Sequence, residues 1–534
     1  MYLDELKIWN FRKYGSGKSI VDDKGILREP DLYLRFNKGL NLLVGENDSG
    51  KSAIVDAVKL VCKTNSSDWV RIDRDDFFTS SERLRIECIF RGLEDEEAKH
   101  FVEWLGREET DGNKQSYLRL NLDVGRLEDR ILPNDVKGGP DDIGSSIDAG
   151  AKELLQLVYL KPLRDAVAEL APKRNSRLSK ILHGHKAFKG KDDSHHLKEI
   201  LVKAKEEIDA YFKDDKAGIA DLDGIALKKE LDALLGSFLP STVSLDSQFD
   251  ISGKTLTEIL ESLKLTLSDA LCGLGSNNLL FIATELLLLQ REKWTGLRLG
   301  LIEEIEAHLH PQAQLRVIEF LQNEAKENLY QIIVTTHSPN LASKVEMDNL
   351  IVCTVDGQAF SMGPGNTQLD DDKDDYKFLR RFLDVTKANM FFARGIILVE
   401  GYAEALLLPV IADKLGKSLT KNGVSVVNVG SAAFLRFAKI FIRTDAKEMP
   451  TKVSVITDYD FRPKEFSVAK KSQKRRKALV EDAFTADEIK VKIDSRTIEE
   501  QKVRTFFSPK WTLEYCLALS EKSRKHLYHA VLMA

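Results

Sequence analysis

The sequence lacks paired cysteines and long apolar segments, and both absences narrow the classes of protein it could represent. Its five cysteines are scattered over 534 residues without a C-x-x-C pair, which argues against structural zinc or a disulfide framework and favours a reducing cytosol. No run of eighteen apolar residues occurs, and Met1–Glu5 does not resemble a signal peptide. We therefore expect a cytoplasmic protein with no membrane partner, and its length predicts two or three domains.

The net charge of −5 hides an uneven distribution of charge along the chain. Residues 391–534 carry 26 Lys and Arg against 17 Asp and Glu, whereas the rest of the chain carries 53 against 67. The densest basic run, Lys470–Lys477, has six bases in eight residues. A basic C-terminal third would attract a polyanion such as DNA. The alternative for such a run is a solvated surface without a partner.

The segment Leu40–Asp56 predicts a nucleotide site. An apolar strand, Leu40–Val44, runs into Gly45–Ser52, which fits the pattern G-x-x-x-x-G-K-[ST], and apolar residues at helical spacing follow. The backbone N–H groups of such a loop cradle phosphates, its lysine adds positive charge, and its serine hydroxyl ligates Mg²⁺. We therefore expect ATP and Mg²⁺ to bind here, through Asn47, Gly50, Lys51 and Ser52.

Paired carboxylates later in the chain predict the second half of this site. Leu299–Ile302 reads as a buried strand that ends in Glu303 and Glu304, a Walker B pattern with glutamate where aspartate is usual. One carboxylate is needed for the water shell of Mg²⁺ and the next to orient the attacking water, roles that we assign to Glu303 and Glu304. Gln331–Thr336 is the next predicted strand. By its resemblance to ABC-type ATPases, the following His337 is expected at the γ-phosphate.

Between these two halves lies a glycine-rich turn, Leu271–Asn278, which opens a predicted helix at Leu279–Leu289. Its place in the chain is similar to the ABC signature, whose helix N-terminus caps the γ-phosphate of the other subunit. That resemblance makes Gly275 and Ser276 nucleotide contacts and implies at least a dimer. Because the usual L-S-G-G-Q is absent, a glycine-rich turn before a buried helix is the competing interpretation.

The N-terminal segment is strand-rich and contains Asn10-Phe11-Arg12 before the glycine loop. It resembles the ATPase heads of chromosome-maintenance complexes and RecF-type repair proteins, in which an arginine near the N-terminus lies close to the nucleotide. Arg12 is therefore a candidate contact, with an ordinary surface arginine as the alternative. Leu84–Phe90 and Tyr117–Leu122 are predicted strands of an antiparallel lobe beside the ATPase core.

A second group of carboxylates follows predicted strands near the C-terminus. Gly395–Val399 leads into Glu400-Gly401 and a helix that carries Glu404, and a later strand ends at Asp458-Tyr-Asp460. Strands that alternate with helices indicate a parallel sheet with functional residues at its C-terminal edge. Carboxylates that converge there would repel one another unless divalent cations bind. The arrangement resembles the Toprim domain of topoisomerases, primases and some nucleases. The predicted catalytic residues are Glu400, Asp458 and Asp460, with Glu304 in the head, and the predicted metal ligands are Glu400, Glu404, Asp458, Asp460, Glu514 and, in the head, Ser52.

The tandem arrangement over nearly the whole chain resembles the OLD (overcoming lysogenization defect) nucleases, a group that includes the nuclease subunit of Gabija-type phage defence systems. The matching motifs are Tyr159–Arg164, Gly273–Asn278, Glu303–Pro311, Glu400–Glu404 and Trp511–Glu514. Ile305 departs from the proline usual in that family, and Lys510 and Lys522 are the candidates for its catalytic lysine. The resemblance implies metal-dependent cleavage or nicking of DNA with Mg²⁺ or Mn²⁺, regulated by ATP, a dimer or tetramer, and a helicase-like partner.

The expected fold is thus α/β: an ABC-type P-loop ATPase head with an inserted helical dimerisation arm, followed by a C-terminal α/β Toprim domain. The predicted boundaries are 1–177 and 244–365 for the two halves of the head, 178–243 for the arm, 366–390 for a linker and 391–534 for the Toprim domain. An insertion without a partner is the alternative for the arm. The alternative function is a DNA-binding ATPase clamp, similar to RecF, whose Toprim domain docks without cutting.

Overall fold

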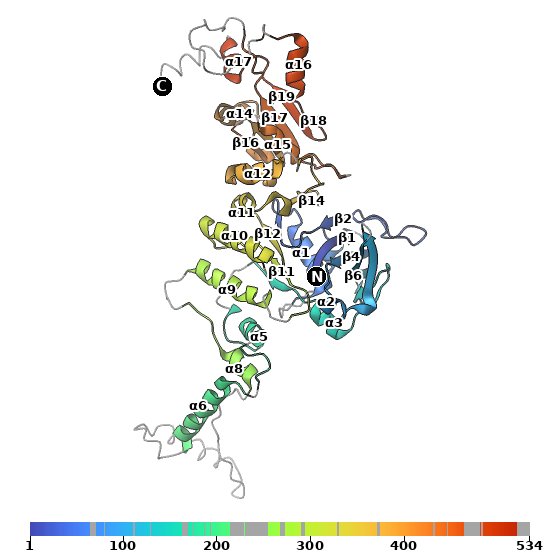
Figure 1. Ribbon diagram of the computed structural model, residues 1–534, viewed down its shortest axis with the longest axis vertical. Helices are drawn as coiled ribbons and strands as arrows, with labels where there is room; N and C mark the ends of the chain where they lie inside the picture. The colour runs from blue at the N-terminus through green and yellow to red at the C-terminus, as the bar shows by residue number, and fades with distance from the viewer. Residues whose placement is uncertain are drawn as a thin grey trace. The chain divides into compact units, whose positions relative to one another are not determined.

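The computed structural model describes most of the chain, in two compact units (Figure 1). The first unit comprises Met1–Asn65, Val70–Pro162 and Thr295–Ala534, and the second comprises Ser66–Trp69 and Leu163–Trp294. Within the described residues, no helix has the length and apolar character needed to cross a membrane. The described residues are 1–64, 71–79, 81–110, 113–128, 130–162, 169–174, 176–185, 187–192, 194–213, 229, 255–267, 273–289, 294–327, 330–370, 374–430, 433–445, 447–463, 481 and 484–520.

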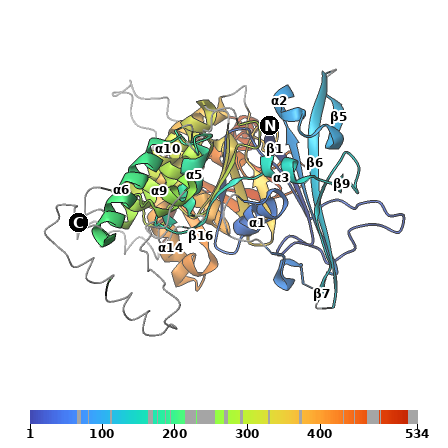
Figure 2. The same cartoon turned by 90° about the horizontal axis from the view of Figure 1, so that it is seen from below.

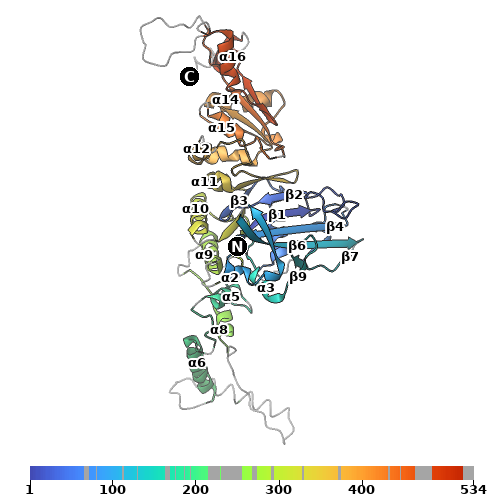
Figure 3. The same cartoon turned by 45° about the vertical axis from the view of Figure 1, so that its right-hand side comes forward.

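The first unit begins with an antiparallel sheet, whose long strands run side by side in Figures 2 and 3. Side chains alternate between its two faces, so that Leu6 and Ile8 lie in the apolar core while Lys7 points the other way. The predicted strands around residues 84–90 and 117–122 are confirmed as neighbours. In sheet order the strands are β2 (Leu32–Arg35), β1 (Tyr2–Trp9), β4 (Arg83–Arg91), β6 (Asn113–Leu127), β8 (Val136–Gly138) and β9 (Ser145–Ser146), with β5 (Leu105–Thr110) and β7 (Arg130–Ile131) paired to β6.

A second, mainly parallel sheet carries the glycine loop. Every residue of its central strands is buried, as expected for parallel strands covered on both faces. The predicted strand bounds at 40–44, 299–302 and 331–336 are confirmed. In sheet order the strands are β10 (Val158–Leu160), β11 (Leu299–Ile302), β12 (Gln331–Thr336), β3 (Leu40–Val44), β13 (Leu350–Thr354) and the antiparallel β14 (Gln358–Ser361).

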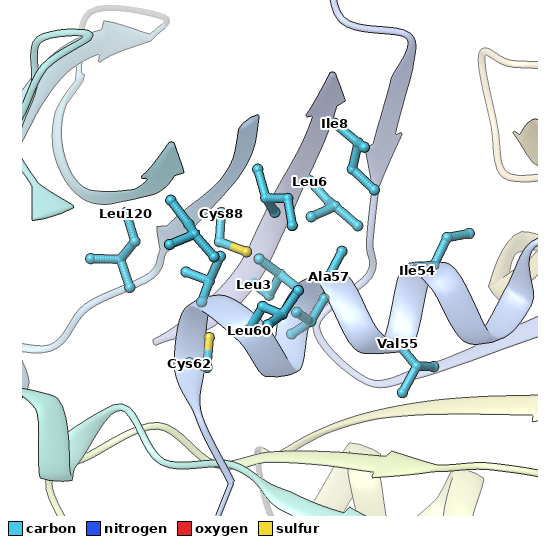
Figure 4. Close-up of a cluster of buried hydrophobic side chains, with 14 of the residues drawn as sticks. Leu3, Leu6, Ile8, Ile54, Val55, Ala57, Leu60, Cys62, Cys88 and Leu120 are labelled. Carbon is cyan, nitrogen blue, oxygen red and sulfur yellow. The ribbon is translucent and has the colours of Figure 1, made fainter. Parts of the chain in front are cut away.

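Helix α1 (Lys51–Cys62) follows the glycine loop and contacts strands of both sheets. Ile54, Ala57 and Leu60 project into the same apolar cluster as Leu6 and Ile8 (Figure 4). Because the helix is covered on several sides, ten of its twelve residues are buried. The core therefore fixes the direction in which α1 leaves the loop.

Short helices and turns complete the head. They are η1 (Arg74–Asp76), α2 (Asp95–Ala98), η2 (Val102–Trp104), α3 (Ala149–Leu154), α10 (Pro311–Glu327), α11 (Pro339–Lys344) and η3 (Met347–Asn349).

The predicted linker at 366–390 contains helices α12 (Asp375–Phe382) and α13 (Val385–Ala388), followed by η4 (Asn389–Phe392). Asp375, the last residue of the acidic run Asp370–Asp375 in this segment, is not solvated. Asp375 is only 2% exposed, and its carboxylate accepts a hydrogen bond of 2.8 Å from Nε of Arg436. A buried carboxylate of this kind is stabilised by its basic partner, so this acid joins the linker to the domain that follows.

The C-terminal domain is built on a five-stranded sheet. Its first strand along the chain, β15 (Gly395–Val399), lies between β16 (Val424–Asn428) and β17 (Lys452–Thr457), and both pairs are parallel. The chain thus moves first to one side of β15 and then to the other, and right-handed crossovers place α14 and α15 on opposite faces. The reversal makes the edge between β15 and β17 the switch point where α/β sheets bind ligands. The remaining elements are α14 (Tyr402–Lys414), η5 (Thr420–Asn422), α15 (Phe434–Lys439), α16 (Ala486–Asp494), β18 (Glu499–Glu500), β19 (Val503–Phe507) and α17 (Leu513–Leu519).

The second unit is helical in its described part and contains α5 (Arg177–Gly184), α6 (His196–Lys213), α8 (Leu256–Ser262) and α9 (Leu274–Leu289). A buried ion pair joins two of these helices, with 2.7 Å between Nη2 of Arg177 and Oε2 of Glu285. Along the sequence, this unit extends beyond the predicted arm at 178–243 on both sides, from Leu163 to Trp294. Helix α9 begins at Leu274, five residues before the predicted Leu279. The role of this unit in dimerisation stays a prediction.

Candidate functional site

Two glycines give the phosphate loop its shape. Gly45 and Gly50 have φ angles of +147° and +94°, which side-chain-bearing residues rarely adopt. A Cβ added to Gly45 would lie 2.2 Å from the carbonyl oxygen of Cys353, and one on Gly50 would lie 2.5 Å from Oη of Tyr14. The loop therefore depends on glycine at both positions.

Lys51 is folded back onto this loop. Its ammonium donates hydrogen bonds to the carbonyl oxygens of Gly45 at 2.9 Å and Glu46 at 2.7 Å, and to Oγ of Ser49 at 3.1 Å. Burial lowers the pKa of Lys51. Among the described residues, no carboxylate lies within ion-pair distance of it. A buried ammonium satisfied only by neutral oxygens suits an incoming anion, so the loop fits the phosphates of ATP.

Glu303 meets the loop from the end of β11. It is 7% exposed, and its Oε1 accepts a hydrogen bond of 2.7 Å from the hydroxyl of Tyr159 on β10. Burial raises the pKa of Glu303, and hydrogen bonds with Tyr159 and Ser52 oppose that rise. The two residues predicted for Mg²⁺ in the head, Ser52 and Glu303, thus lie together. Their oxygen donors fit a hard cation.

Glu304 and His337 lie beside this pair. Glu304 has a φ of +46°, in the left-handed region, and its backbone N–H donates to Oγ1 of Thr335 at 3.1 Å. Its Oε1 is 3.9 Å from Nε2 of His337. Burial lowers the pKa of His337 and nearby Lys51 adds to that effect. The loop, the paired carboxylates and the histidine are therefore gathered at the ends of β3, β11 and β12.

Glu306 is a functional candidate to which the sequence reasoning gave no role. Its carboxylate accepts hydrogen bonds from the hydroxyl of Thr336 at 2.8 Å and from the backbone N–H of His337 at 2.6 Å. It thereby fixes the backbone that presents His337. The available signal was its place three residues after Glu303, in a run of the sequence that was already singled out.

Four further nucleotide contacts were predicted from the sequence, namely Arg12, Asn47, Gly275 and Ser276. The guanidinium of Arg12 pairs with Asp56 at 2.6 Å and with Asp76 at 2.7 Å, so its charge is already engaged within the head. Asn47 is exposed at the loop. Gly275 and Ser276 lie in the first turn of α9, in the second unit. Roles for these four residues at the nucleotide stay predictions.

The C-terminal carboxylates meet at the switch point of the third sheet. Glu400 follows β15 and Asp458 follows β17, and the last paired residues of the two strands are Val399 and Ile456. The hydroxyl of Thr457 also donates a hydrogen bond to Glu400. Glu400 and Asp458 therefore follow neighbouring strands at one edge of the sheet, and their roles as catalytic residues and metal ligands stay predictions.

The pKa of Asp458 is affected by burial and by the neighbouring acids. Burial raises its pKa to about 6, and the charges of Glu404, Glu400 and Glu514 add to the rise. A hydrogen bond of 2.9 Å from the backbone N–H of Leu513 to Oδ1 of Asp458 acts in the opposite direction. Glu404 is buried and Glu514 is exposed. Four carboxylates thus act on one another electrostatically.

Arg496 is the residue that the sequence reasoning missed. It follows α16 and places its guanidinium among the acids, 2.9 Å from Oδ2 of Asp460 and 3.2 Å from Oε1 of Glu400. It also donates to the carbonyl oxygen of Asp458 at 2.8 Å. No local pattern identifies it, because it lies 36 residues after Asp460.

The carboxylate cluster has the oxygen donors that Mg²⁺ and Mn²⁺ prefer. Within the described ranges, however, no three His, Cys, Asp or Glu side chains stand ready to hold one ion. Arg496 contacts one oxygen each of Glu400 and Asp460. By chemical type these carboxylates suit divalent cations.

Of the basic residues predicted to act in catalysis or DNA binding, the structure describes only Lys510. Lys510 is exposed before α17. Lys522 and the basic run Lys470–Lys477 lie outside the described residues.

Comparisons with known proteins agree with this two-part architecture. Residues 40–343 match the family AAA_21, described as "AAA domain, putative AbiEii toxin, Type IV TA system", and residues 391–460 match "Overcoming lysogenization defect protein-like, TOPRIM domain". The chain is 23% identical over 521 residues to Endonuclease GajA of Bacillus cereus (strain HuB5-5), covering 81% of this chain and 73% of that protein.

A second relative is the OLD nuclease of Thermus scotoductus (strain ATCC 700910 / SA-01). It is 27% identical over 176 residues, which is 32% of each protein, so the match spans about a third of that nuclease. Among solved structures, the Smc head domain of Pyrococcus furiosus bound to the C-terminal domain of ScpA matches 67% of this chain and 95% of its own, with 18% identity and a TM-score of 0.36. The chain belongs to the AAA_21 family of ATPase domains and joins that domain to an OLD-like Toprim domain, which makes it a relative of the OLD nucleases.

Proposed function

We propose that the protein is an ATP-regulated, divalent-metal-dependent DNA endonuclease or nickase that acts in antiphage defence. The observation that carries the proposal is the meeting of Glu400 and Asp458 at the ends of two parallel strands, in the segment that matches the OLD-like Toprim domain. The names of the two relatives support cleavage as the output.

The residues that would hold divalent cations at this edge are Glu400, Glu404, Asp458, Asp460 and Glu514. Bound cations would supply positive charge against the charge that builds on a scissile phosphate. The chain itself orients the ligands, because Thr457 bonds Glu400 and the first turn of α17 bonds Asp458. This arrangement leaves Glu404 buried beside them.

The head would bind ATP through the loop around Lys51, and Ser52 and Glu303 would hold its Mg²⁺. Glu304 is placed to orient a water, and Glu306 keeps the backbone of His337 in position. Dimerisation through the heads, with a tetramer as the larger assembly, and a helicase-like partner belong to the same proposal. So does a cytoplasmic location.

Supercoiled plasmid tests the proposed cleavage. We expect the purified chain to nick it with Mg²⁺ or Mn²⁺, and Glu400→Ala and Asp458→Ala to abolish nicking while ATP binding persists. Glu499→Ala, an exposed acid on β18, is the matched control and should retain activity. Nicking that persists in both site variants would reject the proposal.

A non-cutting DNA clamp is the second candidate, because no three acids of the described chain are arranged to hold an ion as they stand. It predicts ATP-dependent DNA association without strand breaks under any metal. A gel-shift assay on the same samples distinguishes the two functions.

A further inference from the structure

Arg496 contacts several members of the carboxylate cluster formed by Glu400, Glu404, Asp458, Asp460 and Glu514. Its Nη1 lies 2.9 Å from Asp460, and its Nη2 is shared among Glu400, Thr457 and the carbonyl oxygen of Asp458. In the described residues, it is the only basic side chain paired with any of the five acids. Its positive charge therefore partly neutralises the carboxylates of the cluster.

One guanidinium does not match the charge around it. The cluster holds the five carboxylates of Glu400, Glu404, Asp458, Asp460 and Glu514, and the guanidinium of Arg496 pairs with two of them, Glu400 and Asp460. A cluster with this excess of negative charge attracts further cations. Any ion that takes oxygens from Glu400 and Asp460 must compete with Arg496 for them.

The guanidinium is held in place and yet incompletely satisfied. The rings of Phe434 and Phe507 lie 6.0 Å and 5.5 Å from its central carbon, which restricts its plane. Its Nε is buried, and no hydrogen-bond partner for it lies among the described residues. An unsatisfied buried donor disfavours the present position. The side chain is 21% exposed, so it is in contact with solvent.

We propose that Arg496 exchanges partners: it neutralises Glu400 and Asp460 before divalent cations bind, and when displaced by them it binds a phosphate of the DNA. The planar fork of a guanidinium suits two oxygens of a phosphate as well as those of a carboxylate. Metal loading and DNA positioning are thereby coupled through one side chain. This inference rests on the proposed nuclease function.

The first test measures metal binding alone. The full chain, without DNA or nucleotide, is titrated with Mn²⁺, and free Mn²⁺ is followed by electron paramagnetic resonance. Arg496→Gln should bind Mn²⁺ about tenfold more tightly than wild type, because it removes a competing cation at a partly exposed site. Arg504→Gln is the matched control, since it removes the same charge from β19, where the side chain donates to the backbone carbonyls of Gln501 and Val503 among the described residues. Its Mn²⁺ affinity should not change.

The second test measures the affinity of a short DNA duplex by fluorescence anisotropy, in Ca²⁺ and in EDTA. Arg496→Gln should weaken binding several-fold in Ca²⁺ and leave it unchanged in EDTA, where the wild-type guanidinium is held by the acids. The salt dependence in Ca²⁺ should fall by about one phosphate contact. Arg496→Lys keeps the charge without the fork, so it should stay close to wild type for Mn²⁺ and still lose DNA affinity.

The results of the two tests distinguish a failure of the partner exchange at Arg496 from a failure of the proposed nuclease function. If wild type does not bind Mn²⁺ at all, the proposed metal-dependent function fails, and the exchange fails with it. If wild type binds Mn²⁺ and neither Arg496 variant changes metal or DNA affinity, the partner exchange alone is overturned. Equal loss of DNA affinity in Ca²⁺ and EDTA would also overturn it. If Arg496→Gln does not fold, Arg496→Lys decides the outcome through its DNA affinity in the two conditions.

Discussion

An ion pair between Glu46 and Arg394 connects the phosphate loop to the strand that ends at Glu400. Nε of Arg394 lies 3.0 Å from Oε2 of Glu46, and the carbonyl oxygen of Glu46 accepts a hydrogen bond from Lys51. Arg394 immediately precedes β15, and its backbone N–H donates to Gly423 at 2.9 Å. When phosphates draw Lys51 away from the loop carbonyls, Glu46 is the next group affected. We predict that breaking this pair weakens the effect of ATP on cleavage.

The expected contribution of the Glu46–Arg394 ion pair depends on how exposed its two side chains are. The side chains of Arg394 and Glu46 are 64% and 25% exposed, and pairs of this kind contribute about 0.2–1 kcal/mol. The pair can therefore change the ratio of nicking rates with and without ATP by a factor of roughly 1.4 to 5 at 25 °C. Because exposed charges are screened, the effect should shrink as salt rises from low to high concentration.

A double-mutant cycle measures this coupling. Nicking rates with and without ATP are compared for wild type, Glu46→Gln, Arg394→Gln and the double variant, with nucleotide affinity measured in parallel. We expect each single change to reduce the ATP effect and the double change to add little. The charge swap Glu46→Arg with Arg394→Glu should restore part of it. The reasoning is refuted if the ATP effect stays at its wild-type value in both single variants while they still bind nucleotide.

Three further predictions concern buried residues, two in the head and one in the helical unit. Gly50→Ala should abolish ATP binding in an otherwise folded head, as measured by isothermal calorimetry, because its new Cβ would lie 2.5 Å from Oη of Tyr14 at an unfavourable φ; retained affinity would contradict this. Tyr14→Phe should stabilise the head against urea by about 1 kcal/mol, because the fully buried hydroxyl has no partner in the described chain; a clear loss would reveal a partner. Glu285→Ala should destabilise the helical unit by about 3–5 kcal/mol, because it removes the carboxylate that pairs with the buried guanidinium of Arg177. Replacing both residues with Leu and Met should cost less, and equal losses would argue against the pair.

The nucleotide half of the site was predictable because its signals are local. A buried strand, a glycine loop and an amphipathic helix occupy seventeen consecutive residues, Leu40–Asp56, and each element has its own pattern. The structure reproduces β3 and α1 from these patterns. The paired acids after β11 were identified for the same reason.

The electrostatic partners were not predictable, because they depend on contacts between distant segments. Arg496 reaches Glu400 across 96 residues, and Tyr159 reaches Glu303 across 144. A sequence window shows the strand end that presents each acid but not the side chain that meets it. Asp375 illustrates the same limit, since in the sequence it only ends an acidic run, and the fold brings Arg436 to it.

The pairing of β10 with β11 has a consequence for how this architecture can vary. These strands are parallel neighbours, joined at Val158–Gly300 and Leu160–Ile302, although Leu163–Trp294 separates them in the chain. In topological terms that whole segment is a crossover connection, the place that a single helix fills in simpler α/β sheets. Related proteins can therefore lengthen, shorten or exchange this module while the strand order of the catalytic head stays intact.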